Sequence, residues 1–136
     1  LNQEMAEKML RSRNLPIFEK LVVEGADPML VAITLENTLV SLRREGCELS
    51  DLNILSELFE KYKKGLFVKA AIPEIIKLAS KGKPISQILE EGSLCRITGA
   101  ELKKIAEDNN FDIARIMQKY RLYIDPKDVE LLKKKD

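Results

Sequence analysis

The chain contains 136 residues, of which 45% are hydrophobic and 33% charged, and its formal net charge is +1. This composition is typical of a globular protein with a real core and excludes a disordered chain, while the near-neutral charge means that only local clusters can predict a polyanionic partner. The sequence has no histidine, which excludes a Cys/His metal site, and no apolar run long enough to span a bilayer.

Two short helices are predicted at the start of the chain. Residues 2–12 carry Met5, Met9 and Leu10 on one side, which predicts an amphipathic helix. A second helix begins near Pro16 and stops at Gly25, because proline suits the first turn of a helix and glycine suits the residue after its end.

The segment from Asp27 to Gly46 is predicted to be the helix around which the chain is organised. Asp27 can cap the first free N–H groups, Pro28 fits the first helical position, and one stripe of the segment is apolar. A second stripe is polar and uncharged, and it either packs closely against another helix or offers a polar surface to a partner. This stripe consists of Thr34, Asn37, Thr38 and Ser41.

Two more helices are predicted in the middle of the chain. Ser50 or Asp51 can cap a helix that ends at about residues 64–65. The next helix, at about 67–80, contains Pro73. Because proline in a helix interior costs about 3 kcal/mol, we expect either a kink there or a true helix start at residues 69–72.

The clearest break in the chain is the sequence KGKP at residues 81–84. It predicts a boundary between a helical subdomain of residues 1–82 and a tail subdomain of residues 83–136. No alternation of apolar and polar residues typical of a strand occurs. The predicted fold is therefore all-α, a multi-helix bundle of two small helical subdomains.

The tail is expected to contain further short helices. One is predicted to end at Gly92, and Thr98 with Glu101 has the spacing of a capping box that begins the next. A helix with Phe111, Ile113, Ile116, Met117 and Tyr120 follows. The dipeptide Asp125-Pro126 predicts the start of the last helix.

Catalytic chemistry finds little support in the sequence. The commonest general base, histidine, is missing, and the six glycines are scattered singly, so no glycine-rich phosphate loop occurs. Acidic pairs such as Glu90-Glu91 lie at predicted helix ends and are typical of a solvated face. Cys95 has Arg96 beside it, but a neighbouring arginine alone does not activate a thiol. No catalytic or metal-binding residue is predicted.

Charge is nevertheless unevenly distributed. Residues 61–83 contain seven lysines and one acid, Glu74, a local charge of 7 − 1 = +6, whereas residues 45–60 contain five acids and no base. This basic belt is either a footprint for sequence-independent contacts to phosphate or an ordinary solubilising surface. Aromatic residues lie within the basic segments and either stack on bases or pack in the core. They are Tyr62, Phe67, Tyr120 and Tyr123.

Candidate RNA-binding residues are the cations of the belt, the two arginines that end the organising helix, and a smaller basic group near the C-terminus. They are Arg43, Arg44, Lys63, Lys64, Lys77, Lys81, Lys83, Lys119, Arg121 and Lys127. If the second basic group folds onto the same side as the first, the prediction of RNA binding is strengthened.

The amino-acid sequence of the chain resembles that of a known family. Residues 6–46, AEKMLRSRNLPIFEKLVVEGADPMLVAITLENTLVSLRREG, are similar to the C-terminal helical and YqeY-type tail region of the E subunit of archaeal glutamyl-tRNA(Gln) amidotransferase. The closing IDPKDVELLKKK resembles the end of the same region. That region is related to the tail of the bacterial B subunit and to the free-standing YqeY proteins.

The resemblance implies a tRNA-binding role in protein biosynthesis. The parent enzyme is an ATP-dependent amidotransferase, a ligase that converts glutamate misacylated on tRNA(Gln) to glutamine. Its catalytic cradle, with ATP and Mg, is implied to lie outside this chain, so no cofactor is expected here. The implied partners are tRNA(Gln), the rest of the E subunit and an amidase-type subunit that supplies ammonia.

Two other interpretations remain open from the sequence. The polar stripe or the acidic segment at residues 45–60 could dock another protein, or the chain could be a free-standing YqeY-like protein. Leu1 in place of a starting methionine favours a piece cut from a longer polypeptide, and without a signal peptide we expect it to be cytoplasmic.

Overall fold

The computed structural model describes residues 2–91 and 94–135, and within these ranges the secondary structure is entirely helical. The prediction of an all-α fold is confirmed. In chain order the elements are α1 (Gln3–Leu10), α2 (Leu15–Val23), α3 (Pro28–Ile33), the π-helix η1 (Thr34–Thr38), α4 (Leu39–Arg44), α5 (Ile54–Lys63), the 3₁₀ turn η2 (Lys69–Ala71), α6 (Ile72–Ser80), α7 (Ile85–Glu90), α8 (Gly99–Asp108), α9 (Ile113–Tyr120) and α10 (Pro126–Lys135). None of the helices in the described ranges is long and apolar enough to cross a membrane.

The organising helix is present as α3, η1 and α4 in direct succession. Asp27 caps it as predicted, with its carboxylate accepting a hydrogen bond from the Leu30 N–H at 3.1 Å. The π-turn was not predicted. The Thr34 hydroxyl donates to the Leu30 carbonyl at 2.8 Å, and such back-bonding by threonine competes with the regular helical bonds.

The polar stripe of this helix is divided between core and surface. Thr34 is buried, Thr38 is half-buried, and Asn37 and Ser41 are exposed. The last three line a shallow hollow that α6 closes from the other side with Pro73. Neither interpretation of the stripe therefore describes all of it.

Several helix starts differ from the sequence-based expectation. Helix α5 begins at Ile54, because the Asp51 carboxylate accepts from the Asn53 N–H at 2.9 Å and forms a turn instead of a helix cap. Pro73 lies in the first turn of α6, so the true start at residues 69–72 is correct and no kink is needed. The capping box at Thr98 is wrong, since its side chain makes no capping hydrogen bond to α8.

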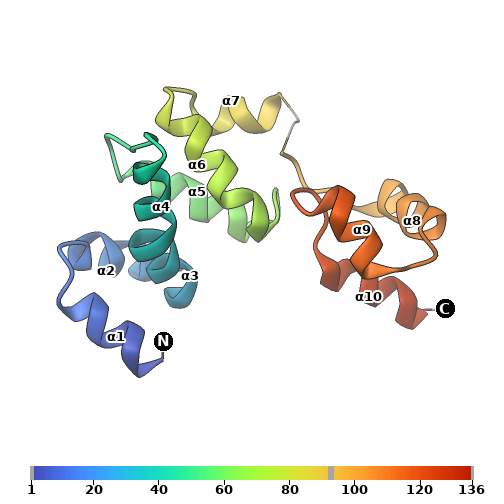
Figure 1. The fold of residues 1–136 in the computed structure, drawn as a ribbon, viewed down its shortest axis with the longest axis horizontal. Helices are drawn as coiled ribbons and strands as arrows, with labels where there is room; N and C mark the ends of the chain where they lie inside the picture. The colour runs from blue at the N-terminus through green and yellow to red at the C-terminus, as the bar shows by residue number, and fades with distance from the viewer. Residues whose placement is uncertain (1, 92–93, 136) are drawn as a thin grey trace.

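Buried side chains form two separate clusters, and Figure 1 shows the corresponding two groups of helices joined by a linker. We call α1–α7 the amino-terminal lobe and α8–α10 the carboxy-terminal lobe. The first cluster includes residues from every helix of its lobe, whereas the second contains far fewer. Met9 is buried in the first cluster as predicted, but Leu10 is 71% exposed, so its placement on the buried side was wrong.

The two clusters separate further along the chain than the KGKP break predicts. Ile85 and Ile88 of α7 are each 1% exposed and pack in the first cluster, as does Leu94. The KGKP segment is thus a turn between α6 and α7, two helices of one lobe. Independent folding of residues 1–82 and 83–136 is a separate property and stays a prediction. The predicted helix end at Gly92 lies outside the described residues, and α7 ends at Glu90.

Candidate nucleic-acid interface

A groove of about 470 Å³ lies between the two lobes. The amino-terminal lobe supplies the end of α5 and the turn at η2, and the carboxy-terminal lobe supplies α9 and the start of α10. The residues that line the groove are Tyr62, Val68, Lys69, Ala70, Met117, Arg121, Ile124, Asp125, Pro126 and Lys127. Segments that are far apart in the sequence therefore form its two walls.

Three cations border this groove, and they come from both basic segments of the sequence. Lys69 belongs to the belt at residues 61–83, whereas Arg121 and Lys127 belong to the smaller C-terminal group, and all three are exposed. None of the three side chains takes part in an ion pair in the part of the chain that the structure describes. With Asp125 as the acid of the groove, its formal charge is 3 − 1 = +2.

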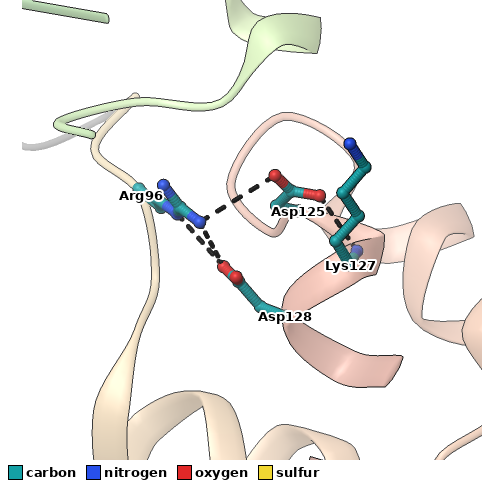
Figure 2. A network of polar contacts seen from close by, with 4 residues as sticks. All are labelled: Arg96, Asp125, Lys127 and Asp128. Atoms are coloured by element: carbon teal, nitrogen blue, oxygen red, sulfur yellow. Dashed lines mark hydrogen bonds and ion pairs between the residues drawn. The ribbon is translucent and has the colours of Figure 1, made fainter. Parts of the chain in front are cut away.

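Asp125, the acid that lines the groove, is engaged by other groups. Asp125 precedes α10 and its carboxylate accepts a hydrogen bond from the backbone N–H of Lys127 at 2.9 Å, so it serves the helix end. Its other oxygen lies 3.9 Å from the guanidinium of Arg96. The ammonium group of Lys127 extends away from this network, as Figure 2 shows.

Tyr62 supplies an aromatic wall on the amino-terminal side. Its ring packs against Phe67 with centroids 5.8 Å apart and an angle of 43° between the rings. Burial raises the pKa of the Tyr62 phenol above its usual value, the negative charge of Asp125 raises it further, and Arg96 acts in the opposite direction. The phenol is therefore neutral at physiological pH and available as a hydrogen-bond donor.

Arg96 links the two lobes and approaches Asp125, one of the residues that line the groove. Figure 2 shows its side chain extending from the linker to the first turn of α10, where Nε and Nη2 lie 3.1 and 2.6 Å from the same oxygen of Asp128. Its backbone N–H donates to the Leu66 carbonyl at 3.0 Å, in the amino-terminal lobe. Because Arg96 and Asp128 are only 24% and 20% exposed, the pair is partly shielded from water and fixes where α10 lies.

The ten predicted RNA-binding residues are distributed over more than one surface. Of these, Arg121 and Lys127 line the groove, and Lys63 lies beside it in an adjoining hollow that also includes Tyr62. Lys119 is exposed on α9. Lys77 borders the shallow hollow between α4 and α6 instead.

Lys64 follows the groove residue Tyr62 by two positions, at the end of α5, and is exposed. The other four predicted residues are separated from the groove. Lys81 and Lys83 follow the far end of α6, roughly 13 Å along that nine-residue helix from η2. Arg43 and Arg44 are exposed at the end of α4. The role of all ten residues in RNA binding stays a prediction.

Carboxylates also reduce the charge of the belt. The side-chain nitrogens of Lys61, Lys64 and Lys83 approach acids at 3.6, 3.0 and 3.1 Å, and Arg43 approaches Glu48 at 3.4 Å. Such exposed pairs contribute little stability, but they lower the positive potential around their cations. In the described ranges, the groove cations therefore lack the nearby carboxylates that several cations of the belt have.

Sequence reasoning missed three elements of this site. Lys69 was counted in the belt but was not among the candidates, and Arg96 was considered only as a neighbour of Cys95. Asp125, just before α10, and Asp128, in its first turn, are three residues apart and both face Arg96, and their spacing is a signal that the sequence contains. Their partner in the linker was not visible from the spacing alone.

The described ranges contain no group of three or more histidine, cysteine, aspartate or glutamate side chains arranged to hold a metal ion. Cys47 and Cys95 are both free and half-buried, and the Cys95 thiol lies 3.1 Å from the Leu89 carbonyl as a hydrogen-bond donor.

Comparison with known proteins finds relatives that are E subunits of glutamyl-tRNA(Gln) amidotransferases. The chain is 35% identical over 113 residues to the E subunit of the glutamyl-tRNA(Gln) amidotransferase of Methanocaldococcus jannaschii, a match that covers 79% of the chain and 18% of that protein. It is 31% identical over 126 residues to that of Methanococcus maripaludis, covering 88% of the chain and 20% of the relative. It is 27% identical over 137 residues to that of Pyrobaculum calidifontis, a match that covers 95% of the chain and 22% of the relative.

The chain therefore spans about a fifth of the length of these relatives. No family model matches the chain, and no solved structure matches it.

Proposed function

Since the chain corresponds to a small part of the E subunit of glutamyl-tRNA(Gln) amidotransferase, as the resemblance of its sequence indicated, we propose that it is a tRNA-binding part of that enzyme. In this proposal it grips tRNA(Gln) while the remaining four-fifths of the subunit carry out the transamidation. The chain itself is non-catalytic.

The groove between the lobes is the observation that carries this proposal. Lys69, Arg121 and Lys127 come from two segments of the sequence and border one hollow, and within residues 2–91 and 94–135 none of them forms an ion pair. Cations gathered in this way neutralise phosphates and release the counterions bound to the nucleic acid, which supplies affinity without reading sequence. An RNA recognised by its shape is bound largely through such contacts.

The cofactors and protein partners belong to the same proposal. ATP and Mg would bind in the part of the E subunit outside this chain, and the rest of that subunit and an amidase-type subunit would be the protein partners. A cytoplasmic location, where tRNA is aminoacylated, follows from this role. The chain has no glycine-rich phosphate loop and no histidine, which is consistent with the proposal that this chain binds RNA and the rest of the subunit carries out catalysis.

Charge reversal in the groove tests the proposal. Binding of a tRNA(Gln) transcript is measured by filter binding over a series of salt concentrations, for the wild-type chain and for Lys69→Glu/Lys127→Glu. We expect the variant to bind at least tenfold more weakly, with a slope of log K against log salt that is smaller by about 0.7–0.9 for each phosphate that is no longer neutralised.

A matched control is available on α8. Lys103→Glu/Lys104→Glu makes the same change in net charge at two exposed lysines away from the groove. We expect it to weaken binding by less than threefold, and Lys81→Glu/Lys83→Glu to lie between the two. Equal losses for the groove and α8 variants would contradict the groove as the binding site, and a wild-type chain that does not bind tRNA at low salt would contradict the proposed function.

A further inference from the structure

We propose that the groove between the lobes holds one unpaired nucleotide of the bound RNA, with its base against Tyr62 and its phosphate between Lys69 and Arg121. This inference rests on the proposed function and names the part of an RNA that the groove takes. It separates the groove from the surrounding basic surface, which contacts phosphates only.

The size of the groove favours a single nucleotide. Its volume of about 470 Å³ falls within the range of roughly 300–1,000 Å³ that is typical of small-molecule sites. An RNA double helix keeps its bases stacked inside and presents phosphates and ribose to a protein, so it would contact only the rim. An unstacked base from a loop enters a hollow of this size.

The chemistry of the lining also matches a nucleotide. Much of the lining is apolar, and one aromatic ring stands at its edge, which is the combination of stacking surface and cations found in proteins that bind single strands. The Tyr62 ring is held in place by Phe67. The apolar residues of the lining are Val68, Ala70, Met117, Ile124 and Pro126.

Polar groups at the rim complete the match. Lys69 and Arg121 stand on opposite walls, from η2 and from the end of α9, so a phosphate between them is contacted from both lobes. Asp125 lies on the same wall as Arg121, and its carboxylate accepts hydrogen bonds from a base amino group or a ribose hydroxyl. A purely anionic ligand would find this acid unfavourable, whereas a nucleotide offers donors to it.

Binding of two fluorescein-labelled RNAs of equal charge, measured by fluorescence anisotropy, tests the inference. One is an unstructured single strand and the other a blunt-ended hairpin closed by a tight loop. We expect the wild-type chain to bind the single strand at least fivefold more tightly.

Two substitutions without charge change examine the base site directly. Tyr62→Leu removes the aromatic ring, and Ala70→Leu places a larger side chain in the groove. Each substitution should lower the affinity for the single strand about tenfold and the affinity for the hairpin less than twofold. Ala100→Leu, on the exposed start of α8, makes the same alanine-to-leucine change outside the groove and should leave both affinities within twofold of wild type. If Tyr62→Leu does not fold, judged by circular dichroism, Ala70→Leu decides the result.

The outcomes distinguish failure of the nucleotide site from failure of tRNA binding. Equal binding of single strand and hairpin, or equal losses of both RNAs in Ala70→Leu, overturns the nucleotide site while leaving tRNA binding in place. No binding of tRNA or of either RNA by the wild-type chain overturns the proposed function itself.

Discussion

The two lobes differ chiefly in how much core each contains. In the amino-terminal lobe, helices from α1 to α7 contribute to one continuous cluster, in which Val31, Leu55 and Ile75 are fully buried. In the carboxy-terminal lobe the buried cluster consists of Leu102, Ala106, Ile116, Ile124 and Val129. A small core supplies little stability, so the second lobe depends more on its attachment to the first. The geometry of the groove therefore depends on that attachment.

The largest expected effect comes from a cavity in each core. Ile116→Ala removes a side chain that is 0% exposed and should cost about 2–5 kcal/mol, as should Ile75→Ala in the other lobe. Because its core is small, the carboxy-terminal lobe should lose amide protection in α8–α10 in Ile116→Ala while α5 and α6 stay protected. Hydrogen exchange with mass spectrometry reads each lobe separately. Equal loss along the whole chain in both variants would show one cooperative unit instead.

Removing the link between the lobes should have a smaller effect. Arg96→Ala leaves the half-buried carboxylate of Asp128 without its partner and should cost about 1–3 kcal/mol. The lobes should then separate, with a larger radius of gyration in small-angle scattering and weaker tRNA binding. Arg115→Ala, an exposed arginine of α9, is the control and should change neither quantity. An unchanged radius of gyration in Arg96→Ala would show that apolar packing alone positions α10.

Two helix starts for which the sequence predicts a capping side chain should differ in how much that side chain contributes to stability. Asp27→Ala removes an observed cap from α3 and should cost about 1 kcal/mol. Thr98→Ala should lower the free energy of unfolding by only about a few tenths of a kcal/mol, since the Thr98 side chain makes no capping hydrogen bond. Urea denaturation of both variants measures the difference, and similar costs would mean that Thr98 does cap α8 in solution.

The smallest effect is confined to alkaline pH. The pKa of Tyr62, in the amino-terminal lobe, is raised by burial and by Asp125 of the other lobe. In the unfolded chain the phenol has its ordinary pKa near 10.0. Above that pH the unfolded state loses its proton first, so stability falls until the folded pKa is passed, and is unaffected at lower pH.

Substitution of either partner checks this assignment. Tyr62→Phe should remove that part of the alkaline loss, and Asp125→Asn should lower the pKa of Tyr62 toward 10.0. The difference in phenolate absorbance between wild type and Tyr62→Phe isolates this tyrosine. If Asp125→Asn leaves its titration unchanged, the lobes do not approach each other closely enough at this point.

Local signals in the sequence predicted most of the helices and failed where packing decides. Asp27, Pro28 and Pro73 determine helix starts through hydrogen bonding and a fixed backbone angle, which act within one turn. The π-turn at Thr34 accompanies a competing local bond, that of the Thr34 hydroxyl to the Leu30 carbonyl, and the Thr98 side chain makes no cap despite its spacing to Glu101. Spacing alone does not resolve such competition.

Of the candidate site, the sequence predicted the basic segments but not their arrangement in space. The sequence identified both basic segments, and the structure brings parts of them together at the groove. Which cation faces the groove depends on how the lobes dock. The contacts between the lobes include those of Arg96, whose acidic partners lie 29 or more residues away in sequence, and the packing of Leu122 and Tyr123 against the first core. The chain does turn at the KGKP segment, as its sequence predicted. The following helix α7 nevertheless belongs to the first core, because Ile85 and Ile88 are buried there.

The most direct test of RNA binding between the lobes is photo-crosslinking of a tRNA(Gln) transcript containing 4-thiouridine to the chain, with the linked peptides identified by mass spectrometry. The account predicts links to both walls of the groove, in the segment that contains Tyr62 and Lys69 and in the segment that contains Arg121 and Lys127. Links confined to α1–α4 or to α8, with neither wall of the groove labelled, would contradict it.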